Sequence, residues 1–283
     1  MSVGNNDYQY EYVPGWGKDN GDFKLGVVSG HATDSKDRVY VVDREPTPRI
    51  AVFDRRGKLL DTWGTDLFPI PHDIWIDGDD RVYVADCADH TVKICTTKGE
   101  KLQTLGTPGQ AGGPGMPFNQ PTRAVTSPAG EIWVADGYGQ HRVHRFSADG
   151  IHLSSWGERG PASEQLSLPH NIFVDQQERV WIADREPNNS IKVFDASGNL
   201  LDCWKGRICP CGLFIDAEGV VYVAEGHGVS IFTAEGTLMT HIPLPIDPQV
   251  AGHGSHSVWV DSHNDMYVGE VGKENLFHKF TRI

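Results

Sequence analysis

The sequence predicts an all-β fold, a six-bladed β-propeller whose blades are four-stranded antiparallel sheets. Three observations support this prediction. A strand motif recurs six times at intervals of roughly 40 to 50 residues, and turn residues separate its copies. The last repeat lacks its fourth strand, and a segment near the N-terminus resembles that strand. A parallel α/β fold would need helical stretches of about 10 to 15 residues between strands, and the sequence has none.

The recurring strand is a short run of β-branched and aromatic residues that ends in an acidic side chain. A turn residue, Asp in most copies, stands at a fixed distance before each acidic end, so each repeat is expected to open with a hairpin. We expect the acidic ends to bond backbone groups of their own turns rather than to catalyse. The six copies are Val39–Asp43, Val82–Asp86, Ile132–Asp136, Val180–Asp184, Val221–Glu225 and Met266–Glu270.

A third and a fourth strand complete each repeat. The fourth strand commonly ends in Trp-Gly, as at Trp63, and the last repeat stops at Ile283 after only three strands. The segment 10–17 looks like the missing fourth strand, so we expect the N-terminus to supply the outer strand of blade 6 and close the ring. The sequence thus predicts one domain over residues 1–283. The third strands are expected at Ile50–Phe53, Val92–Ile94, Val143–Phe146, Ile191–Phe194 and Val229–Phe232.

Composition limits the partners of this protein. The chain has 283 residues and a net charge of −13, from 25 Lys and Arg against 38 Asp and Glu. This excess of negative charge argues against nucleic acid and anionic membranes as partners. No apolar run approaches the roughly 18 residues of a membrane span, and the start resembles no secretory signal. Five cysteines, an odd number, favour a reducing compartment. We therefore expect a cytoplasmic protein with no obligate protein partner.

One position at the start of each first strand distinguishes the six repeats. First strands line the central channel of a propeller, so histidines in alternate blades can converge on its axis. Three imidazoles with an open fourth position are the ligand set of a catalytic zinc ion. The alternative is that a histidine after proline merely begins a strand. The occupants in blades 1 to 6 are Ser29, His72, Thr122, His170, Cys211 and His256.

The loops after the acidic ends are expected at the same mouth of the channel as the histidines. They carry Arg44, Tyr138, Arg185 and His227. Arginines gathered at the mouth of an acidic protein predict a small anionic substrate, most simply a carboxylate. The alternative is that each arginine pairs with the glutamate next to it in sequence, and that Tyr138 packs on the rim.

Three further features have structural interpretations. Cys209 and Cys211 form a C-x-C without a second pair, so Cys211 is expected to be a small buried residue. His31 is expected to line the channel deeper than the position occupied by Ser29. The segment 109–115 is rich in glycine and lacks the lysine of a phosphate-binding loop, so we expect a flexible loop that could act as a lid.

The repeats resemble NHL repeats, because Val134-Ala135-Asp136 and His141-Arg142-Val143 follow that family's pattern. The chain as a whole resembles the peptidyl-α-hydroxyglycine α-amidating lyase family, six-bladed propellers with a zinc ion held by histidines on three alternate blades. The segments that carry this resemblance are Pro71-His72, Pro169-His170, Ser255-His256, Asp136-Gly137-Tyr138 and Ala183-Asp184-Arg185-Glu186.

The resemblance implies particular roles for these residues. Zn²⁺ would be held by His72, His170 and His256, Tyr138 would be the catalytic base, and Arg44 and Arg185 would bind the substrate. The sequence departs from the family at two places: Gly139 replaces a cysteine, and Ser257 replaces the aspartate that holds a structural Ca²⁺. The second departure puts calcium in doubt.

The implied reaction is cleavage of the C–N bond of a carbinolamide (α-hydroxyglycine-like) carboxylate, which gives an amide and glyoxylate or a similar oxo acid. Two alternatives remain open from the sequence. A zinc-dependent hydrolase could use the same open position to attack a small lactone, amide or ester. A non-catalytic NHL-type propeller could bind a partner, with the three histidines incidental.

Overall fold

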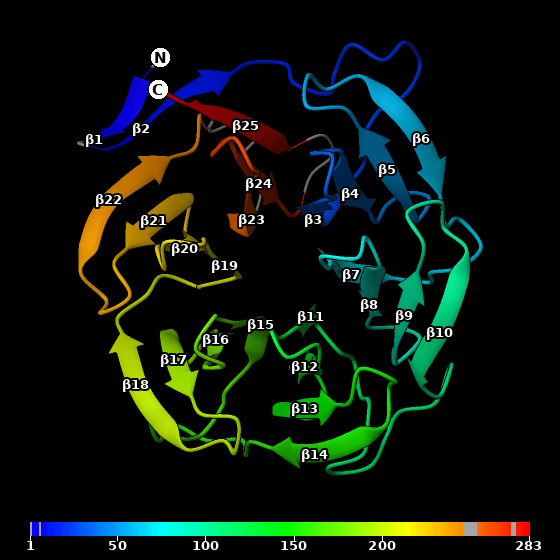
Figure 1. Cartoon of the computed structure of the whole chain (residues 1–283), viewed down its shortest axis with the longest axis vertical. Coiled ribbons are helices and arrows are strands. Elements are labelled where there is room, and N and C mark those ends of the chain that lie inside the picture. Colours follow the sequence, from blue (N-terminus) through cyan, green and yellow to red (C-terminus); the bar gives the residue numbers. More distant parts are fainter. Residues whose placement is uncertain (1, 6, 246–253, 273–275) are drawn as a thin grey trace. The chain divides into compact units, whose positions relative to one another are not determined.

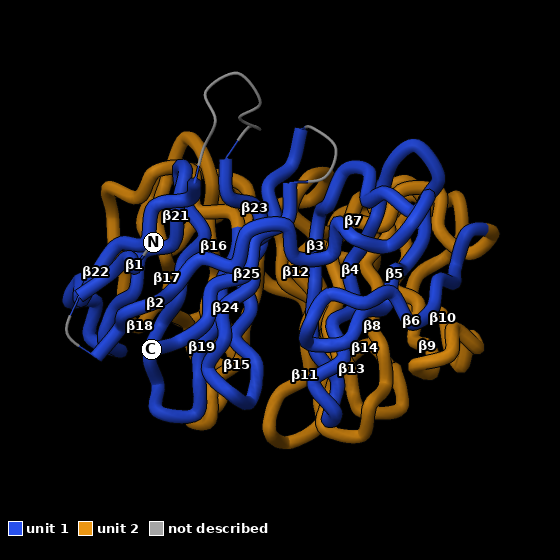
Figure 2. Tube along the Cα trace, turned by 90° about the horizontal axis from the view of Figure 1, so that it is seen from above, with its two compact units in different colours: residues 1–65, 212–283 blue, residues 66–211 orange. Residues whose placement is uncertain are grey.

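The computed structural model describes residues 2–5, 7–245, 254–272 and 276–283 (Figure 1). These residues form β-strands and turns, and none of the described elements is a helix. The described part of the chain accordingly contains no helix long and apolar enough to cross a membrane. The chain divides into two compact units, unit 1 (residues 1–65 and 212–283) and unit 2 (residues 66–211), coloured separately in Figure 2. The single domain over residues 1–283 stays a prediction.

The strands form six antiparallel sheets, five of which are built from strands that follow one another along the chain. Five sheets have four strands, and the sixth has five because the N-terminal strands join it. This is the sheet composition of a six-bladed β-propeller, and the predicted fold class is confirmed.

Unit 2 contains blades 2, 3 and 4. Blade 2 consists of β7 (Pro71–Ile76), β8 (Val82–Asp86), β9 (Thr91–Cys95) and β10 (Lys101–Gly106). Blade 3 consists of β11 (Arg123–Thr126), β12 (Ile132–Asp136), β13 (Arg142–Phe146) and β14 (His152–Trp156). Blade 4 consists of β15 (Pro169–Val174), β16 (Val180–Asp184), β17 (Ser190–Phe194) and β18 (Leu200–Lys205).

Unit 1 contains blades 1, 5 and 6. Blade 1 consists of β3 (Val28–Thr33), β4 (Val39–Asp43), β5 (Arg49–Phe53) and β6 (Leu59–Trp63). Blade 5 consists of β19 (Gly212–Ile215), β20 (Val221–Glu225), β21 (Gly228–Phe232) and β22 (Leu238–Pro243). Blade 6 consists of β23 (Ser255–Val260), β24 (Met266–Glu270), β25 (Phe277–Arg282), β2 (Tyr8–Val13) and β1 (Ser2–Asn5).

The second strands, β4, β8, β12, β16, β20 and β24, begin and end at the predicted residues. All of their residues are buried. They are continuous apolar runs, as expected of fully buried strands, and they pack neighbouring blades together, as between blades 5 and 6 and between blades 3 and 4. The outer strands β6, β10, β14 and β18 are half-buried or exposed at most positions.

The turn aspartates make the hairpins that the sequence predicts. Asp77 accepts hydrogen bonds from the backbone N–H groups of Asp79 and Arg81 and from the Tyr83 hydroxyl. One carboxylate thus closes the turn and anchors an aromatic side chain of the following strand. The same pattern of two N–H groups and one aromatic donor recurs at Asp34, Asp175, Asp216 and Asp261.

The acidic strand ends have a different role from the predicted one. Asp184 accepts hydrogen bonds from the N–H groups of Ser167 and Leu168, which precede the first strand of the same blade. Asp43, Asp86 and Asp136 bond the corresponding segment in their own blades. The expectation that these carboxylates bond backbone groups of their own turns is confirmed at Asp86, which also accepts from the N–H groups of Ala88 and Asp89, and is wrong at Asp136 and Asp184. Antiparallel pairing places the end of the second strand beside the start of the first, so the carboxylate reaches that segment.

The N-terminal segment completes blade 6, as predicted. β2 pairs antiparallel with β25, with Tyr10 opposite Arg282 and Val13 opposite Lys279, so both ends of the chain lie in one sheet (Figure 1). Trp16 then packs its buried ring against Phe53, Tyr267 and Phe277, which brings blades 1 and 6 together within unit 1.

Truncation of Trp16 is expected to destabilise the fold. Trp16→Ala removes a ring that is 5% exposed, and we expect a loss of about 3 kcal/mol in the free energy of unfolding. Urea unfolding followed by fluorescence measures it. Leu60→Ala, at a side chain that is 49% exposed on β6, is the control and should change stability by less than about 0.5 kcal/mol. Equal effects of the two changes would contradict the packing role of Trp16.

Candidate metal centre and active site

The first strands of blades 2, 4 and 6 each contain a β-bulge at the predicted histidine. In blade 2, Pro71 lies opposite Asp86 and Asp73 lies opposite Ala85, so His72 is the extra residue. A bulge bends the strand and re-aims the side chain of its extra residue, and bulges are common beside active sites. The equivalent register shifts place His170 and His256 at the same position of their blades.

Backbone carbonyl groups orient two of these imidazoles in unit 2. His72 Nδ1 lies 2.7 Å from the Thr122 carbonyl oxygen, and His170 Nδ1 lies 2.8 Å from that of Cys211. A carbonyl oxygen only accepts hydrogen bonds, so Nδ1 carries the proton in both rings and Nε2 carries the lone pair. Metal-binding histidines commonly have this arrangement, in which the second nitrogen donates to a carbonyl group.

His256 has the same arrangement within unit 1. Its Nδ1 lies 2.6 Å from the Ser29 carbonyl oxygen, so Nε2 again carries the lone pair. The three acceptors, Ser29, Thr122 and Cys211, are the residues at the equivalent position of blades 1, 3 and 5. The even blades therefore supply imidazoles and the odd blades supply the carbonyl groups that orient them.

Tyr138 contacts both histidines of unit 2. Its hydroxyl oxygen lies 2.9 Å from His72 Nε2 and 3.2 Å from His170 Nε2, and the two imidazole centroids are 4.8 Å apart. A hydroxyl has one proton, so it can donate to only one of these two lone pairs at a time. Two nitrogen lone pairs directed at one place are a donor set that fits Zn²⁺.

Two glycines hold the Tyr138 loop close to its neighbours. A Cβ atom on Gly137 would lie 2.3 Å from the Pro169 carbonyl oxygen, directly before His170. A Cβ atom on Gly139 would lie 2.2 Å from the Asn119 carbonyl oxygen. Only glycine fits at these two positions without a shift of the backbone, and the contact at Pro169 ties the tyrosine loop to the strand that carries His170.

The other predicted site residues lie in the loops after their second strands. Arg44, in unit 1, is directed toward Glu45, with Nε 4.0 Å from Oε1. Arg185, in unit 2, forms a closer ion pair with Glu186, with Nη2 2.8 Å from Oε1. The pairing with adjacent glutamates, which the sequence left open, therefore occurs. His227 is exposed in the turn between β20 and β21, and its predicted role in substrate binding stays a prediction.

A buried polar cluster follows the histidines and was not predicted. Arg123 donates to Asp73 Oδ2 at 2.7 Å, and Asn171 donates to the same oxygen at 3.0 Å. Burial raises the pKa of Asp73, while the Arg123 guanidinium acts in the opposite direction. Asp73, Arg123 and Asn171 each directly follow the repeat position that holds the histidine in even blades. A comparison of the next position along the repeats would therefore have pointed to the cluster. One carboxylate thus joins β7, β11 and β15.

Comparisons with known proteins agree with this architecture. Residues 118–146 match the NHL repeat. Mouse NHL repeat-containing protein 3 is 32% identical over 67% of this chain and 58% of its own length. Peptidyl-glycine alpha-amidating monooxygenase B of Xenopus laevis is 32% identical over 68% of this chain and 25% of its length. The probable peptidyl-alpha-hydroxyglycine alpha-amidating lyase pgal-1 of Caenorhabditis elegans is 32% identical over 52% of this chain and 43% of its length.

The chain contains an NHL repeat and is similar to proteins named as peptidyl-alpha-hydroxyglycine alpha-amidating lyases. It spans less than two thirds of the length of these curated relatives. Two solved structures share the fold at low sequence identity. A gluconolactonase from Xanthomonas campestris has a TM-score of 0.72 at 16% identity, covering 91% of this chain and 86% of its own. A streptogramin B lyase has a TM-score of 0.67 at 15% identity, covering 96% and 86%.

The structure gives physical reasons for the two departures from the amidating-lyase pattern. Gly139 faces the Asn119 carbonyl oxygen so closely that a cysteine side chain would need the loop to move. The Ser257 hydroxyl is hydrogen-bonded to His31, with Oγ 2.9 Å from Nδ1. The other ring nitrogen of His31, Nε2, lies 2.9 Å from the Tyr267 carbonyl oxygen. His31 therefore holds blade 1 to blade 6 within unit 1.

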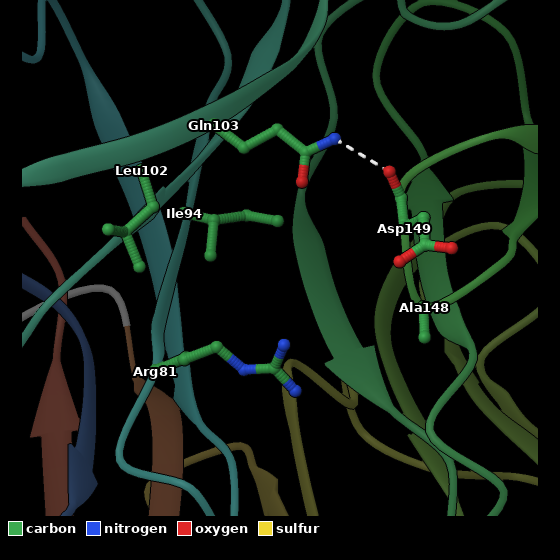
Figure 3. Close-up of a pocket in the computed structure, with 6 residues that line it drawn as sticks. All are labelled: Arg81, Ile94, Leu102, Gln103, Ala148 and Asp149. Atoms are coloured by element: carbon green, nitrogen blue, oxygen red, sulfur yellow. Dashed lines mark hydrogen bonds between the residues drawn. The ribbon is translucent and has the colours of Figure 1, made fainter.

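A surface hollow lies apart from these residues, between blades 2 and 3 (Figure 3). Gln103 spans it by donating to the Asp149 carbonyl oxygen at 2.9 Å. Its lining includes Arg81 and Leu102 but none of the predicted site residues. The glycine-rich segment 109–115 is tied down, since Gly112 N–H donates to Phe118 and Gly115 N–H donates to Gln140. Its predicted role as a lid stays a prediction.

Adding one methyl group beside Tyr138 is expected to disturb its loop. Gly137→Ala forces the chain away from Pro169, and overpacking of this kind costs about 1 to 3 kcal/mol of unfolding free energy. Thermal unfolding measures the loss. Gly113→Ala is the control, because a Cβ there meets nothing within 4 Å. A Gly137→Ala protein as stable as the control would refute the close packing at this position.

Proposed function

We propose that the protein is a zinc-dependent lyase that cleaves the C–N bond of a carbinolamide carboxylate, releasing an amide and glyoxylate or a similar oxo acid. The observation that carries this proposal is the Tyr138 hydroxyl within hydrogen-bond distance of Nε2 of both His72 and His170. Relatives named as amidating lyases support the reaction class. The substrate is a proposal of this work, since the chain spans only part of those relatives.

The zinc ligands in this proposal are His72, His170 and His256. Their support is the shared bulge and the shared hydrogen bond from Nδ1 to a backbone carbonyl group, which leaves Nε2 as the ligating atom in each ring. Zinc would supply a Lewis acid that lowers the pKa of a hydroxyl group at its open position. The proposed cofactor is Zn²⁺ alone, because the hydroxyl of Ser257 is already engaged by His31.

Tyr138 is the proposed base. Its oxygen lies beside the nitrogens that would hold the metal, so it can reach the hydroxyl group of a substrate bound there. Tyr138 would act in its ionised form: the substrate hydroxyl passes its proton to the Tyr138 oxygen, the C–O bond becomes a carbonyl and the C–N bond breaks. Tyr138 then returns that proton to the departing amide nitrogen. The reaction consumes no water, which distinguishes this lyase from a hydrolase.

Arg44 and Arg185 are the proposed carboxylate-binding residues, with His227 at the rim. A guanidinium can bind a carboxylate with two parallel hydrogen bonds, which orients the bond that breaks. Arg44 faces the carboxylate of Glu45, and Arg185 forms an ion pair with that of Glu186. A substrate carboxylate would therefore take the place of a glutamate carboxylate. Both side chains are only 21% exposed, which limits competition from water.

The products decide between lyase, hydrolase and binding protein. An N-acyl-α-hydroxyglycine should give the primary amide and glyoxylate, both measurable by chromatography. Small lactones and esters that give only their acids would instead identify a hydrolase. A protein that binds no zinc and turns over neither class would support a binding propeller. The cytoplasmic location and the lack of nucleic-acid, membrane and obligate protein partners remain proposals from composition.

Removal of the Tyr138 hydroxyl is expected to slow the reaction without loss of zinc. Tyr138→Phe should lower kcat by about 100-fold or more, the range for a missing proton-transfer group, while zinc content stays that of the wild type. Glyoxylate release and plasma mass spectrometry measure the two quantities. Tyr12→Phe, on β2 of blade 6, is the control. Full turnover by Tyr138→Phe would show that another group takes the proton.

Zinc content tests the ligand set directly. Wild-type protein should hold about one zinc ion per chain, and His72→Ala, His170→Ala or His256→Ala should each lose it, because a three-ligand site retains little affinity with two ligands. His263→Ala is the control, since that side chain is 56% exposed. A wild type that stays metal-free after incubation with zinc would overturn the proposed centre.

A further inference from the structure

The residues Cys209 and Cys211 lie together in the segment before β19, at the end of unit 2. Their Sγ atoms are 3.7 Å apart, although the sequence suggested only a small buried residue at Cys211. Cys211 is buried, as predicted, while Cys209 is half-buried and within reach of solvent. A reactive sulfur and a protected sulfur are thus neighbours, which is the arrangement of a redox-active dithiol.

The backbone permits these two sulfurs to bond. Cys209 has a φ of +50°, in the left-handed region, and Pro210 follows it, so the short segment turns back and both side chains face each other. A disulfide needs an S–S distance of about 2.05 Å, so the sulfurs must approach by about 1.7 Å. Side-chain rotation and a small shift of the segment can supply this movement.

The charges around the pair make Cys209 the nucleophile. The hydrogen bond with Cys211 and the nearby Arg185 guanidinium lower the pKa of Cys209 to about 7. The same hydrogen bond and burial raise the pKa of Cys211. Cys209 is therefore the more accessible sulfur of the pair and lies near the Arg185 guanidinium, so it is the sulfur that reacts first.

We propose that Cys209 and Cys211 are a redox modification site, oxidised to an intramolecular disulfide by low-molecular-weight disulfides. The Cys209 thiolate attacks one sulfur of the small disulfide, forming a mixed disulfide and releasing one thiolate, which takes up a proton. Cys211 then loses its proton to solvent and attacks Cys209 Sγ, which releases the second small thiol. The two cysteines together lose two electrons, which reduce the small disulfide to two thiols.

Oxidation of Cys209 and Cys211 to a disulfide would affect the proposed metal centre through the backbone of Cys211. The carbonyl oxygen of this residue accepts the hydrogen bond that orients His170. A disulfide that draws Cys211 toward Cys209 disturbs this bond, and loss of such a support typically lowers metal affinity by about tenfold or more. This consequence rests on the proposed function, whereas the disulfide itself does not.

Oxidised glutathione is the probe for the disulfide. Wild-type protein incubated with it should lose two hydrogens in the peptide that contains Cys209 and Cys211, as shown by mass spectrometry without prior reduction. Cys211→Ser should instead trap one glutathionyl group on Cys209, and Cys209→Ser should react slowly. Cys203→Ser is the control and should form the same disulfide as the wild type. A wild type in which Cys209 and Cys211 remain thiols would overturn the proposal.

Zinc release tests the consequence for the site. Oxidised wild type should transfer zinc to a chromogenic chelator about tenfold more readily than reduced protein, while Cys209→Ser should be unaffected by glutathione disulfide. If the disulfide forms and zinc release does not change, the coupling to His170 is wrong. If the disulfide forms but the protein never holds zinc, the proposed function fails and the dithiol assignment stands.

Discussion

The hydrogen bond between each of three buried histidines and a backbone carbonyl group determines which ring nitrogen carries the lone pair. It assigns the proton to Nδ1 and the lone pair to Nε2 in His72, His170 and His256. Without that constraint an imidazole rotates and exchanges tautomers, and neither ring nitrogen has a defined position. The bonds of His72 and His256 each join two neighbouring blades of one unit, so the packing of these blades and the orientation of the imidazoles depend on the same contacts.

The repeat has become specialised in alternate blades. Even blades place a histidine at the bulge, and odd blades place at the equivalent position of the repeat a residue whose carbonyl group accepts the hydrogen bond. In blades 3 and 5 the acceptor residues, Thr122 and Cys211, directly precede the first strand instead of lying within it. The same fold element therefore provides the histidines and the carbonyl groups that orient them, and acidic ends such as Asp184 hold the segment before the first strand of their own blade in place.

The tyrosine loop shows how close packing and function coincide. Tyr138 lies between two glycines whose Cα atoms approach backbone carbonyl groups from outside the loop. That packing places the tyrosine oxygen against two imidazoles at 2.9 and 3.2 Å. On the neighbouring blade, Arg185 lies beside both Glu186 and the Cys209–Cys211 pair. The proposed substrate-binding arginine and the proposed redox-active cysteine pair thus lie in one region of unit 2.

The sequence by itself determined the blade count, the bounds of the second strands, the N-terminal strand of blade 6 and the positions of the three histidines. It could do so because strand period, turn residues and the repeat are local signals that recur along the chain. Only the tertiary structure decided the bulges, the carbonyl partners, the Asp73–Arg123–Asn171 cluster and the approach of Cys209 to Cys211. The repeat shows which residues follow the histidines, but which side chains and carbonyl groups meet depends on the register between strands and on contacts between blades.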